Sequence, residues 1–249
     1  MIKIAIYGKG GIGKSTCTAN LAAALADMGR KVIQIGCDPK ADSTMTLLGG
    51  ENVIPVMEYL RTHEEPPADH SLISRRGHGG VLCIETGGPT PGMGCAGRGI
   101  VASFDLLSEL RLFEREKPDA VLYDVLGDVV CGGFAVPIRE GYADRVFIVT
   151  SGEKMSLYAA DNICRAVDSF ADRGYAKVGG IILNRRNIPD EEQKVLAFAE
   201  AHGTSVIADI PRSDDITACE DRGMTVIEGA PESPAAKAFA ALARRIAET

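Results

Sequence analysis

The segment Gly-Lys-Gly-Gly-Ile-Gly-Lys-Ser at residues 8–15 constrains the fold of this chain more than any other feature. It fits the pattern G-x-x-x-x-G-K-[ST], follows an apolar run at residues 2–7 and opens a helix-like pattern at residues 14–28. A strand, a glycine-rich turn and a helix in this order form a P-loop, in which backbone N–H groups and the helix N-terminus bind phosphate. We expect Lys14 to reach the β- and γ-phosphates and the Ser15 hydroxyl to bind Mg²⁺. The remaining residues of the predicted phosphate-binding loop are Gly10, Gly11, Ile12, Gly13 and Thr16.

Short apolar runs alternate with helix-like segments along the whole chain. The runs predict strands at residues 2–7, 31–35, 81–85, 120–123, 145–150, 180–183 and 205–210, and several are apolar on both faces. The clearest helical patterns cover residues 14–28, 99–116, 154–172, 190–201 and 233–247. Strands without a polar face need helices on both sides, so we expect an α/β, doubly wound, mainly parallel sheet. We expect a single domain over residues 1–249, with a surface excursion at residues 63–78.

Composition and charge exclude several classes of function. The 249 residues carry 27 basic and 34 acidic side chains, a net charge of −7, and no basic tail. Binding to nucleic acid or to an anionic membrane runs on Lys and Arg, so neither is an expected partner. No run approaches the roughly 18 apolar residues of a membrane span, and the first strand begins too close to Met1 for a targeting segment. Seven cysteines without a C-x-x-C pair argue against a disulfide framework or a zinc ribbon, and favour the cytoplasm.

Acidic residues follow two of the predicted strands. Asp38 lies in the segment 36–43 that leaves one strand, and Asp124 ends another and is followed by Asp128. P-loop enzymes hold the shell of Mg²⁺ with such acids at the carboxyl ends of neighbouring strands. We expect Asp38 to orient the attacking water, with a helix cap as the alternative role for each acid.

Two of the seven cysteines have unusual surroundings. Cys95 and Cys131 are flanked by glycines, and each precedes an expected helix start, where N–H groups can bond to sulfide and lower a thiolate pKa. A 4Fe–4S cluster needs four thiolates, so a symmetric dimer would supply two from each chain. Four other cysteines are expected to be small buried apolar residues, as is common for free cysteine: Cys17, Cys83, Cys164 and Cys219. The position of Cys37 beside Asp38 is ambiguous, and we expect a structural role for it.

Longer motifs show a resemblance to a known family. The loop holds a lysine, Lys9, in addition to Lys14. This additional lysine resembles that of the deviant-Walker ATPases, which include partitioning ATPases, division-site ATPases and nitrogenase iron proteins. Residues 37–44, 94–99 and 123–134, in a match that runs from residue 1 to about 226, resemble the nitrogenase iron protein family. The resemblance implies an ATP-dependent reductase with one 4Fe–4S cluster per homodimer. Such a reductase passes single low-potential electrons to a nitrogenase or nitrogenase-like catalytic protein and receives them from ferredoxin or flavodoxin.

The same resemblance implies roles for individual residues. Lys9 would cross the dimer interface to the nucleotide of the other subunit, and Cys95 and Cys131 would ligate the cluster. Arg98 would belong to the partner-docking surface, and its equivalent is ADP-ribosylated in some members. Residues implied around MgATP are Lys14, Ser15, Asp38, Lys40, Asp42, Asp124 and Asp128, with Asn184, Pro211 and Arg212 near the adenine.

Two departures from the family leave the catalytic partner open. The chain looks shorter at its end than nitrogenase iron proteins proper, and residues 59–78 look divergent. Relatives of the family serve chlorophyll biosynthesis, nickel-tetrapyrrole reduction in methanogens and methylthio-alkane reduction. The segment 97–99 looks less like the chlorophyll branch than like the nitrogenase and nickel-tetrapyrrole branches.

Two rival functions share the P-loop core. A partitioning or division-site ATPase would be expected to carry a basic DNA-binding patch or a basic membrane helix, and the sequence shows neither. A P-loop carrier of iron–sulfur clusters would use a C-x-x-C pair, which is absent.

The acids and the cysteines suggest a switch. Asp124 and Cys131 are seven residues apart, so at most about 25 Å of chain joins them. We therefore expect γ-phosphate and Mg²⁺ to order Asp124 and Asp128, and that ordering to shift Cys131.

Overall fold

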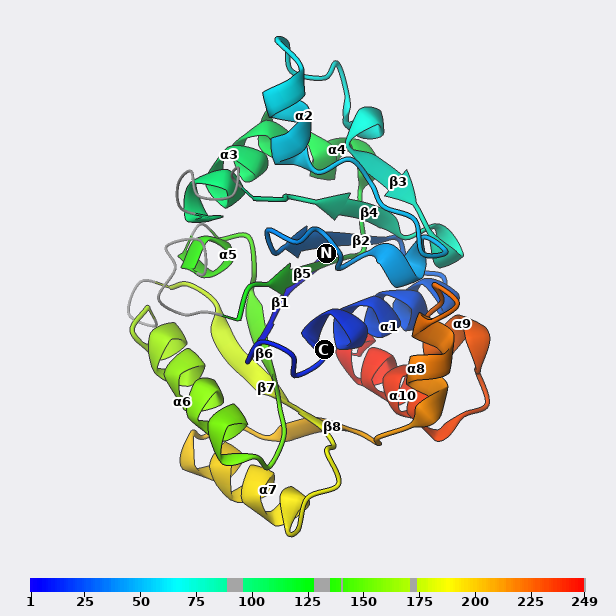
Figure 1. Ribbon diagram of the computed structural model, residues 1–249. Helices are drawn as coiled ribbons and strands as arrows, with labels where there is room; N and C mark the ends of the chain where they lie inside the picture. The colour runs from blue at the N-terminus through cyan, green and yellow to red at the C-terminus, as the bar shows by residue number, and fades with distance from the viewer. Residues whose placement is uncertain (89–95, 128–134, 140, 171–173, 249) are drawn as a thin grey trace.

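The computed structural model describes residues 1–88, 96–127, 135–139, 141–170 and 174–248 (Figure 1). In this part of the chain, eight strands form one sheet in the order β3-β4-β2-β5-β1-β6-β7-β8. Neighbouring strands are parallel, except that β3 runs antiparallel to β4. The strands are β1 (Ile2–Gly8), β2 (Val32–Cys37), β3 (Ser74–Arg76), β4 (Leu82–Glu85), β5 (Ala120–Val125), β6 (Arg145–Thr150), β7 (Lys177–Asn184) and β8 (Val206–Ile210). The predicted mainly parallel sheet is confirmed.

Helices cover both faces of this sheet (Figure 1). One core lies under helices α1, α8, α9 and α10, and a second core lies under α2 to α7. The helices are α1 (Lys14–Asp27), α2 (Val56–Thr62), α3 (Ala96–Glu109), α4 (Leu112–Glu116), α5 (Val136–Arg139), α6 (Lys154–Asp168), α7 (Glu191–Ala201), α8 (Asp214–Glu220), α9 (Val226–Gly229) and α10 (Pro234–Ala247). No helix in the described ranges has both the length and the apolar character needed to cross a membrane.

The alternation of side chains along β5 directs its acid toward the P-loop helix. Val121 and Tyr123 enter the core under α2 to α7, whereas Leu122 enters the core under α1. Successive side chains of a strand point to opposite faces, so Asp124 shares the face of Leu122. The strand thereby delivers a buried carboxyl to the side of the sheet where α1 begins.

Several predicted boundaries differ from those of the structure. The helix expected at residues 99–116 is two helices, because Arg111 has φ 54° and ends the regular hydrogen bonding between α3 and α4. The helix expected at residues 154–172 ends at Asp168, with Ser169 as its C-cap. The excursion expected at residues 63–78 contains the edge strand β3, whose Ser74 pairs with Ile84 of β4.

Candidate nucleotide and cluster site

The P-loop joins the end of β1 to the start of α1, as the sequence predicts. Three of its carbonyl groups accept hydrogen bonds: Lys9 O from the Ile12 N–H at 3.1 Å, Ile12 O from Asn184 Nδ2 at 2.7 Å, and Gly11 O from the Arg186 guanidinium at 2.7 Å. Asn184, the last residue of β7, and Arg186, just after β7, therefore fix the loop from outside. Fixed donors at a helix N-terminus need no reorganisation when an anion binds.

A cavity of about 670 Å³ opens over the loop. It brings the P-loop together with the three charged residues that follow β2, as the sequence analysis expects. The backbone N–H of Lys40 donates to Asp38 Oδ1 at 3.0 Å, a local turn that shapes this wall. The cavity is lined by Gly10, Gly11, Gly13, Lys14, Ser15, Thr16, Asp38, Pro39, Lys40, Asp42, Leu126 and Gly127.

A second cavity of about 270 Å³ shares Gly11, Gly13 and Thr16 with the first. It contains the three residues implied near adenine, which are Asn184, Pro211 and Arg212. The size and the shared wall suit a nucleoside whose phosphates extend over the P-loop.

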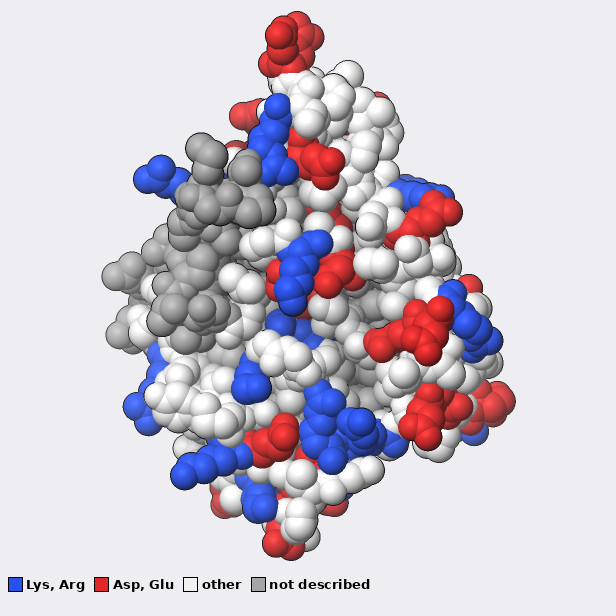
Figure 2. Space-filling model, in the orientation of Figure 1, with Lys and Arg blue, Asp and Glu red and all other residues white. Residues whose placement is uncertain are grey.

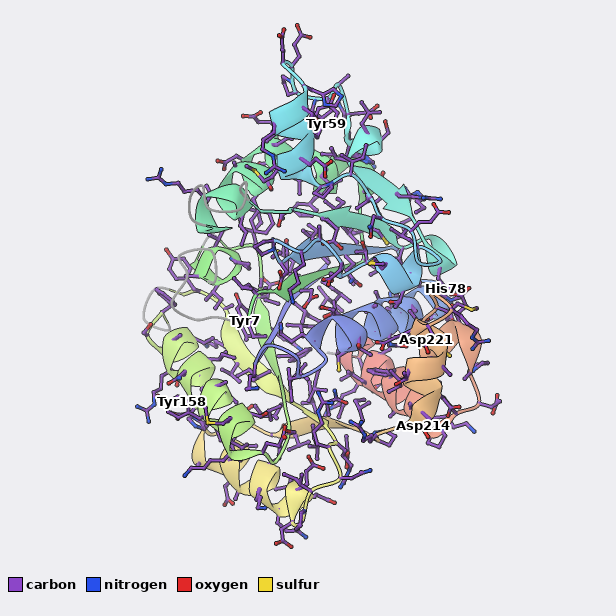
Figure 3. All side chains as sticks on the ribbon, in the orientation of Figure 1. Tyr7, Tyr59, His78, Tyr158, Asp214 and Asp221 are labelled. Carbon is purple, nitrogen blue, oxygen red and sulfur yellow. The ribbon has the colours of Figure 1, made fainter. Side chains whose placement is uncertain are left out.

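Helix α8 supplies a wall of this second cavity that the sequence analysis missed. Asp214, Thr217 and Glu220 line it, and Figure 3 shows Asp214 at the start of α8. The Thr16 hydroxyl donates to Glu220 Oε1 at 2.5 Å and so joins α8 to the P-loop helix. No periodic apolar pattern marked this short helix, although Ser213 followed by two acids is an N-cap signal.

Asp124 lies buried beside Lys14 and Ser15. Its Oδ2 accepts the hydroxyl of Ser43 at 2.6 Å, while its Oδ1 has no hydrogen-bond partner among the described residues. Burial raises the pKa of this carboxyl, although the charge of Lys14 and hydrogen bonds from Ser15 and Ser43 oppose the rise. A buried carboxylate oxygen without a partner is costly, and a water of a Mg²⁺ shell would satisfy it. These residues therefore fit MgATP.

A second buried acid, Glu85, was not singled out from the sequence. It ends β4 with 1% of its surface exposed, and its Oε1 accepts the N–H and the hydroxyl of Thr44 at 2.8 and 2.7 Å. Burial raises its pKa to about 8. The signal that identified Asp124, an acid at the carboxyl end of an apolar strand, would have found Glu85 as well.

The end of β5 packs directly on the P-loop. A Cβ at Gly127 would lie 2.3 Å from the carbonyl oxygen of Gly8 and 3.0 Å from the nitrogen of Gly10. The chain that leaves β5 therefore passes the phosphate-binding loop at backbone contact distance before it reaches Asp128.

Three of the predicted site residues, Cys95, Asp128 and Cys131, lie outside the described residues. Lys9, at the P-loop, and Arg98, in the first turn of α3, are both described and exposed.

The other cysteines behave as the sequence analysis expects. All five described cysteines are buried free thiols: Cys17, Cys37, Cys83, Cys164 and Cys219. Burial raises the pKa of Cys17, Cys83 and Cys164 to about 12, so these thiols stay protonated and are poor metal ligands. The described residues contain no cluster of three or more His, Cys, Asp or Glu that could hold a metal ion.

Comparison with known proteins decides the family. The family model of the 4Fe-4S iron sulfur cluster binding proteins, NifH/frxC family, matches residues 2–249. The chain belongs to this family. It is 51% identical over 248 residues to the nitrogenase iron protein of Methanospirillum hungatei JF-1, a match that covers 99% of this chain and 88% of that protein.

Solved structures that resemble the chain show the fold. The cell division ATPase MinD of Pyrococcus furiosus matches with a TM-score of 0.74 at 23% identity, covering 100% of this chain and 99% of that one. A ParA family ATPase from Chlorobium tepidum TLS matches with a TM-score of 0.72 at 20% identity, covering 98% of each chain. At this identity the likeness confirms the doubly wound P-loop architecture and carries no statement about function.

Family membership gives the class of chemistry. The protein is an ATP-dependent oxidoreductase component of the nitrogenase iron protein type, with a 4Fe–4S cluster and MgATP as cofactors. The family also implies a homodimer and a catalytic partner of the nitrogenase type.

Proposed function

We propose that this protein passes single low-potential electrons to a nitrogenase or nitrogenase-like catalytic protein, and that MgATP hydrolysis gates each transfer. The bound 4Fe–4S cluster would supply the one-electron chemistry. The observation that carries the proposal is the placement of Asp124, which is buried beside the P-loop and whose Oδ1 has no hydrogen-bond partner in the described part of the chain. The strand that holds Asp124 leads, seven residues later, to Cys131. A nucleotide-sensing acid and a cysteine on so short a connection favour a reductase over an ATPase without redox chemistry.

Cys95 and Cys131 are the proposed cluster ligands. The burial of the five described cysteines supports this choice, because those thiols cannot reach a shared surface between subunits, and burial also raises the pKa of Cys17, Cys83 and Cys164. Two thiolates from each chain give the four that one cluster needs. The assignment therefore requires a homodimer with the cluster on its two-fold axis.

The charged residues of the phosphate cavity have separate proposed roles. Lys14 neutralises phosphate charge, Ser15 ligates Mg²⁺, and Asp38 orients the attacking water, as their positions in the 670 Å³ cavity allow. Exposed Lys9 would reach the nucleotide of the other subunit. The other proposed contacts are Lys40, Asp42, Asp124 and Asp128 around MgATP, and Asn184, Pro211 and Arg212 around the adenine.

The segment after Asp124 is the proposed switch. Gly127 rests against Gly8 and Gly10, so a nucleotide that orders the P-loop also constrains this segment. Ordering of Asp124 and Asp128 would then shift Cys131, and exposed Arg98 would contact the partner as the dimer closes. If Asp128→Asn binds MgATP yet still lets MgATP change the access of chelators to the cluster iron, this switch assignment is wrong.

The charge distribution favours the reductase over a DNA-partitioning ATPase. On the face drawn in Figure 2, acidic and basic side chains are interspersed instead of forming one basic surface. The net charge of −7 agrees with that view. We place the protein in the cytoplasm, where buried free thiols persist.

Electron transfer to a partner tests the function. The reduced, cluster-loaded dimer is mixed under argon with a molybdenum–iron protein, and the spin-resonance signal of the reduced cluster is followed with and without MgATP. We expect loss of the signal only with MgATP and partner together. Loss without nucleotide, or no loss with any nitrogenase-like, nickel-tetrapyrrole or methylthio-alkane reductase partner, contradicts the proposal. Reduction of the oxidised dimer by ferredoxin or flavodoxin identifies the donor.

A further inference from the structure

Glu85 and Asp124 lie on either side of Gly36 in the sheet. The strand register pairs Gly36 of β2 with Glu85 of β4 and with Asp124 of β5. A Cβ at position 36 would lie 1.8 Å from Glu85 Oε2, so the Glu85 carboxyl occupies the space that a side chain would fill. The absence of a side chain at Gly36 therefore leaves room for the Glu85 carboxyl beside the β2 backbone, one strand away from Asp124.

Both acids hold the same dipeptide, Ser43-Thr44. Glu85 Oε1 accepts hydrogen bonds from the backbone N–H and the hydroxyl of Thr44, and Asp124 Oδ2 accepts one from the hydroxyl of Ser43. Gln34 Nε2 adds bonds to the carbonyl and hydroxyl oxygens of Ser43 at 2.9 and 3.0 Å. All five side chains are at most 2% exposed. Buried hydrogen bonds are strong because the surroundings have a low dielectric constant. The dipeptide therefore cannot move without breaking one of these bonds or displacing a strand end.

The dipeptide joins three segments of the proposed machinery. Before it come Asp38, Lys40 and Asp42, which line the phosphate cavity. Asp124 leads to the segment of Cys131. Glu85 leads to Thr86, whose N–H donates to Gly36 O at 2.8 Å, and Cys95 follows ten residues after Glu85.

We propose that Glu85 is a positioning residue that, through Thr44, couples the nucleotide-facing loop 38–42 to the strand leading toward Cys95. The inference rests on the proposed MgATP-dependent reductase and deepens it, because it gives the second cysteine segment its own connection to the nucleotide. Asp124 serves the segment of Cys131, and Glu85 serves the segment of Cys95. Movement of the dipeptide would then reach both cysteine segments together.

The protonation of Glu85 indicates which variants preserve this contact. With a pKa of about 8, the carboxyl is mostly neutral at pH 7, and the amide of Gln has the same shape and the same oxygen acceptor for Thr44. Glu85→Gln is therefore the conservative variant, and Glu85→Leu removes the acceptor. Thr44→Val keeps the shape of Thr44 and removes only its hydroxyl.

Hydrogen exchange of the cluster-loaded homodimer tests the coupling. Exchange at residues 82–88 is measured with and without MgATP in the wild type and the three variants, alongside the dissociation constant for MgATP. We expect MgATP to slow exchange there in the wild type and in Glu85→Gln. In Thr44→Val and Glu85→Leu, we expect the MgATP effect to fall by about tenfold, the size of one buried hydrogen bond to a carboxyl group. MgATP affinity should change by less than about threefold, since neither side chain lines the cavity.

A control variant separates coupling from stability. Thr225→Val also removes a buried threonine hydroxyl that bonds to a backbone N–H, that of Glu228 at the start of α9, and should keep the wild-type MgATP effect. If MgATP slows exchange at residues 82–88 in Thr44→Val as much as in the wild type, the proposed coupling is wrong, and the proposed reductase function is unaffected. If Glu85→Leu does not fold, Thr44→Val decides alone. A wild type that binds no MgATP would overturn both proposals.

Discussion

Burial leaves Asp124 with one carboxylate oxygen, Oδ1, that accepts no hydrogen bond from the described residues. Burying an oxygen without a partner costs free energy, and this cost is recovered only when a ligand supplies a hydrogen-bond donor or a cation. We expect Asp124→Asn to weaken MgATP binding by about tenfold to a hundredfold, the range for loss of a charge-assisted contact. The unliganded variant should be at least as stable as the wild type, because a buried charge is removed. Calorimetric titration with MgATP measures the first effect and thermal unfolding the second.

A matched control for Asp124→Asn is Asp161→Asn, which removes a carboxylate that pairs with Arg165 and His202 far along the chain from the P-loop. It should leave MgATP affinity unchanged. Wild-type affinity in Asp124→Asn would show that this acid plays no part in the Mg²⁺ shell.

The buried carboxyl of Glu85 should make the stability of the folded protein depend on pH, in a direction that the structure predicts. Its pKa is raised by burial from 4.5 to about 8, so the folded state holds the proton more tightly than the unfolded state. The stability contributed by the neutral carboxyl is complete below pH 4.5 and is lost as the pH rises toward 8. We expect the stability difference between Glu85→Gln and wild type to grow with pH across this window. Urea unfolding at several pH values measures it, and a constant difference would mean that Glu85 titrates normally.

The contact between Gly127, two residues after β5, and the P-loop fixes the position of the phosphate-binding backbone. We expect Gly127→Ala to raise the dissociation constant for MgATP by at least about tenfold, because a methyl group 2.3 Å from Gly8 O must displace one of the two segments. Gly203→Ala is the control, since its Cβ would meet nothing within 4 Å although its φ is 62°. The control should lose about 1 kcal/mol of stability and no affinity. Equal affinity in Gly127→Ala and wild type would mean that the segment moves away without cost.

The elements that the sequence predicted are those with a strong period. Strands such as β5 and β6 are apolar on both faces because helices cover both, and this pattern is visible without a structure. The three residues of β3 carry no such pattern, since an edge strand of Ser74, Arg75 and Arg76 needs no apolar face. The break between α3 and α4 was missed because Arg111 has a left-handed backbone conformation, which an arginine in the sequence does not predict.

The candidate site was predictable for a related reason. The P-loop residues and the acids Asp38 and Asp124 follow from local order along the chain. In the structure, the P-loop and Asp38 line a cavity that shares residues with a second one, and Asp124 is buried beside Lys14. The wall formed by α8 and the contact between Glu85 and Thr44 depend on packing between segments that are far apart in sequence. Distant contacts of this kind have no local signal.

Ligation of one 4Fe–4S cluster requires two chains. Each chain has two cysteines outside the described residues, Cys95 and Cys131, and five that are buried as free thiols. A single chain therefore offers half of the four thiolates of a 4Fe–4S cluster. Dimerisation and cluster binding should be linked, so removal of the cluster with a chelator should weaken the dimer. Sedimentation of cluster-loaded and cluster-free protein measures this, and equal dimer stability would contradict the linkage.

The iron content of the dimer after anaerobic purification shows directly whether two chains share one cluster. We expect about four irons for each pair of wild-type chains, and the same content in Cys164→Ala, which changes one of the buried thiols. Cys95→Ser and Cys131→Ser should each lose the iron. Four irons retained after both serine substitutions in one chain, or a cluster carried by a monomer, would rule out a cluster shared through these two cysteines.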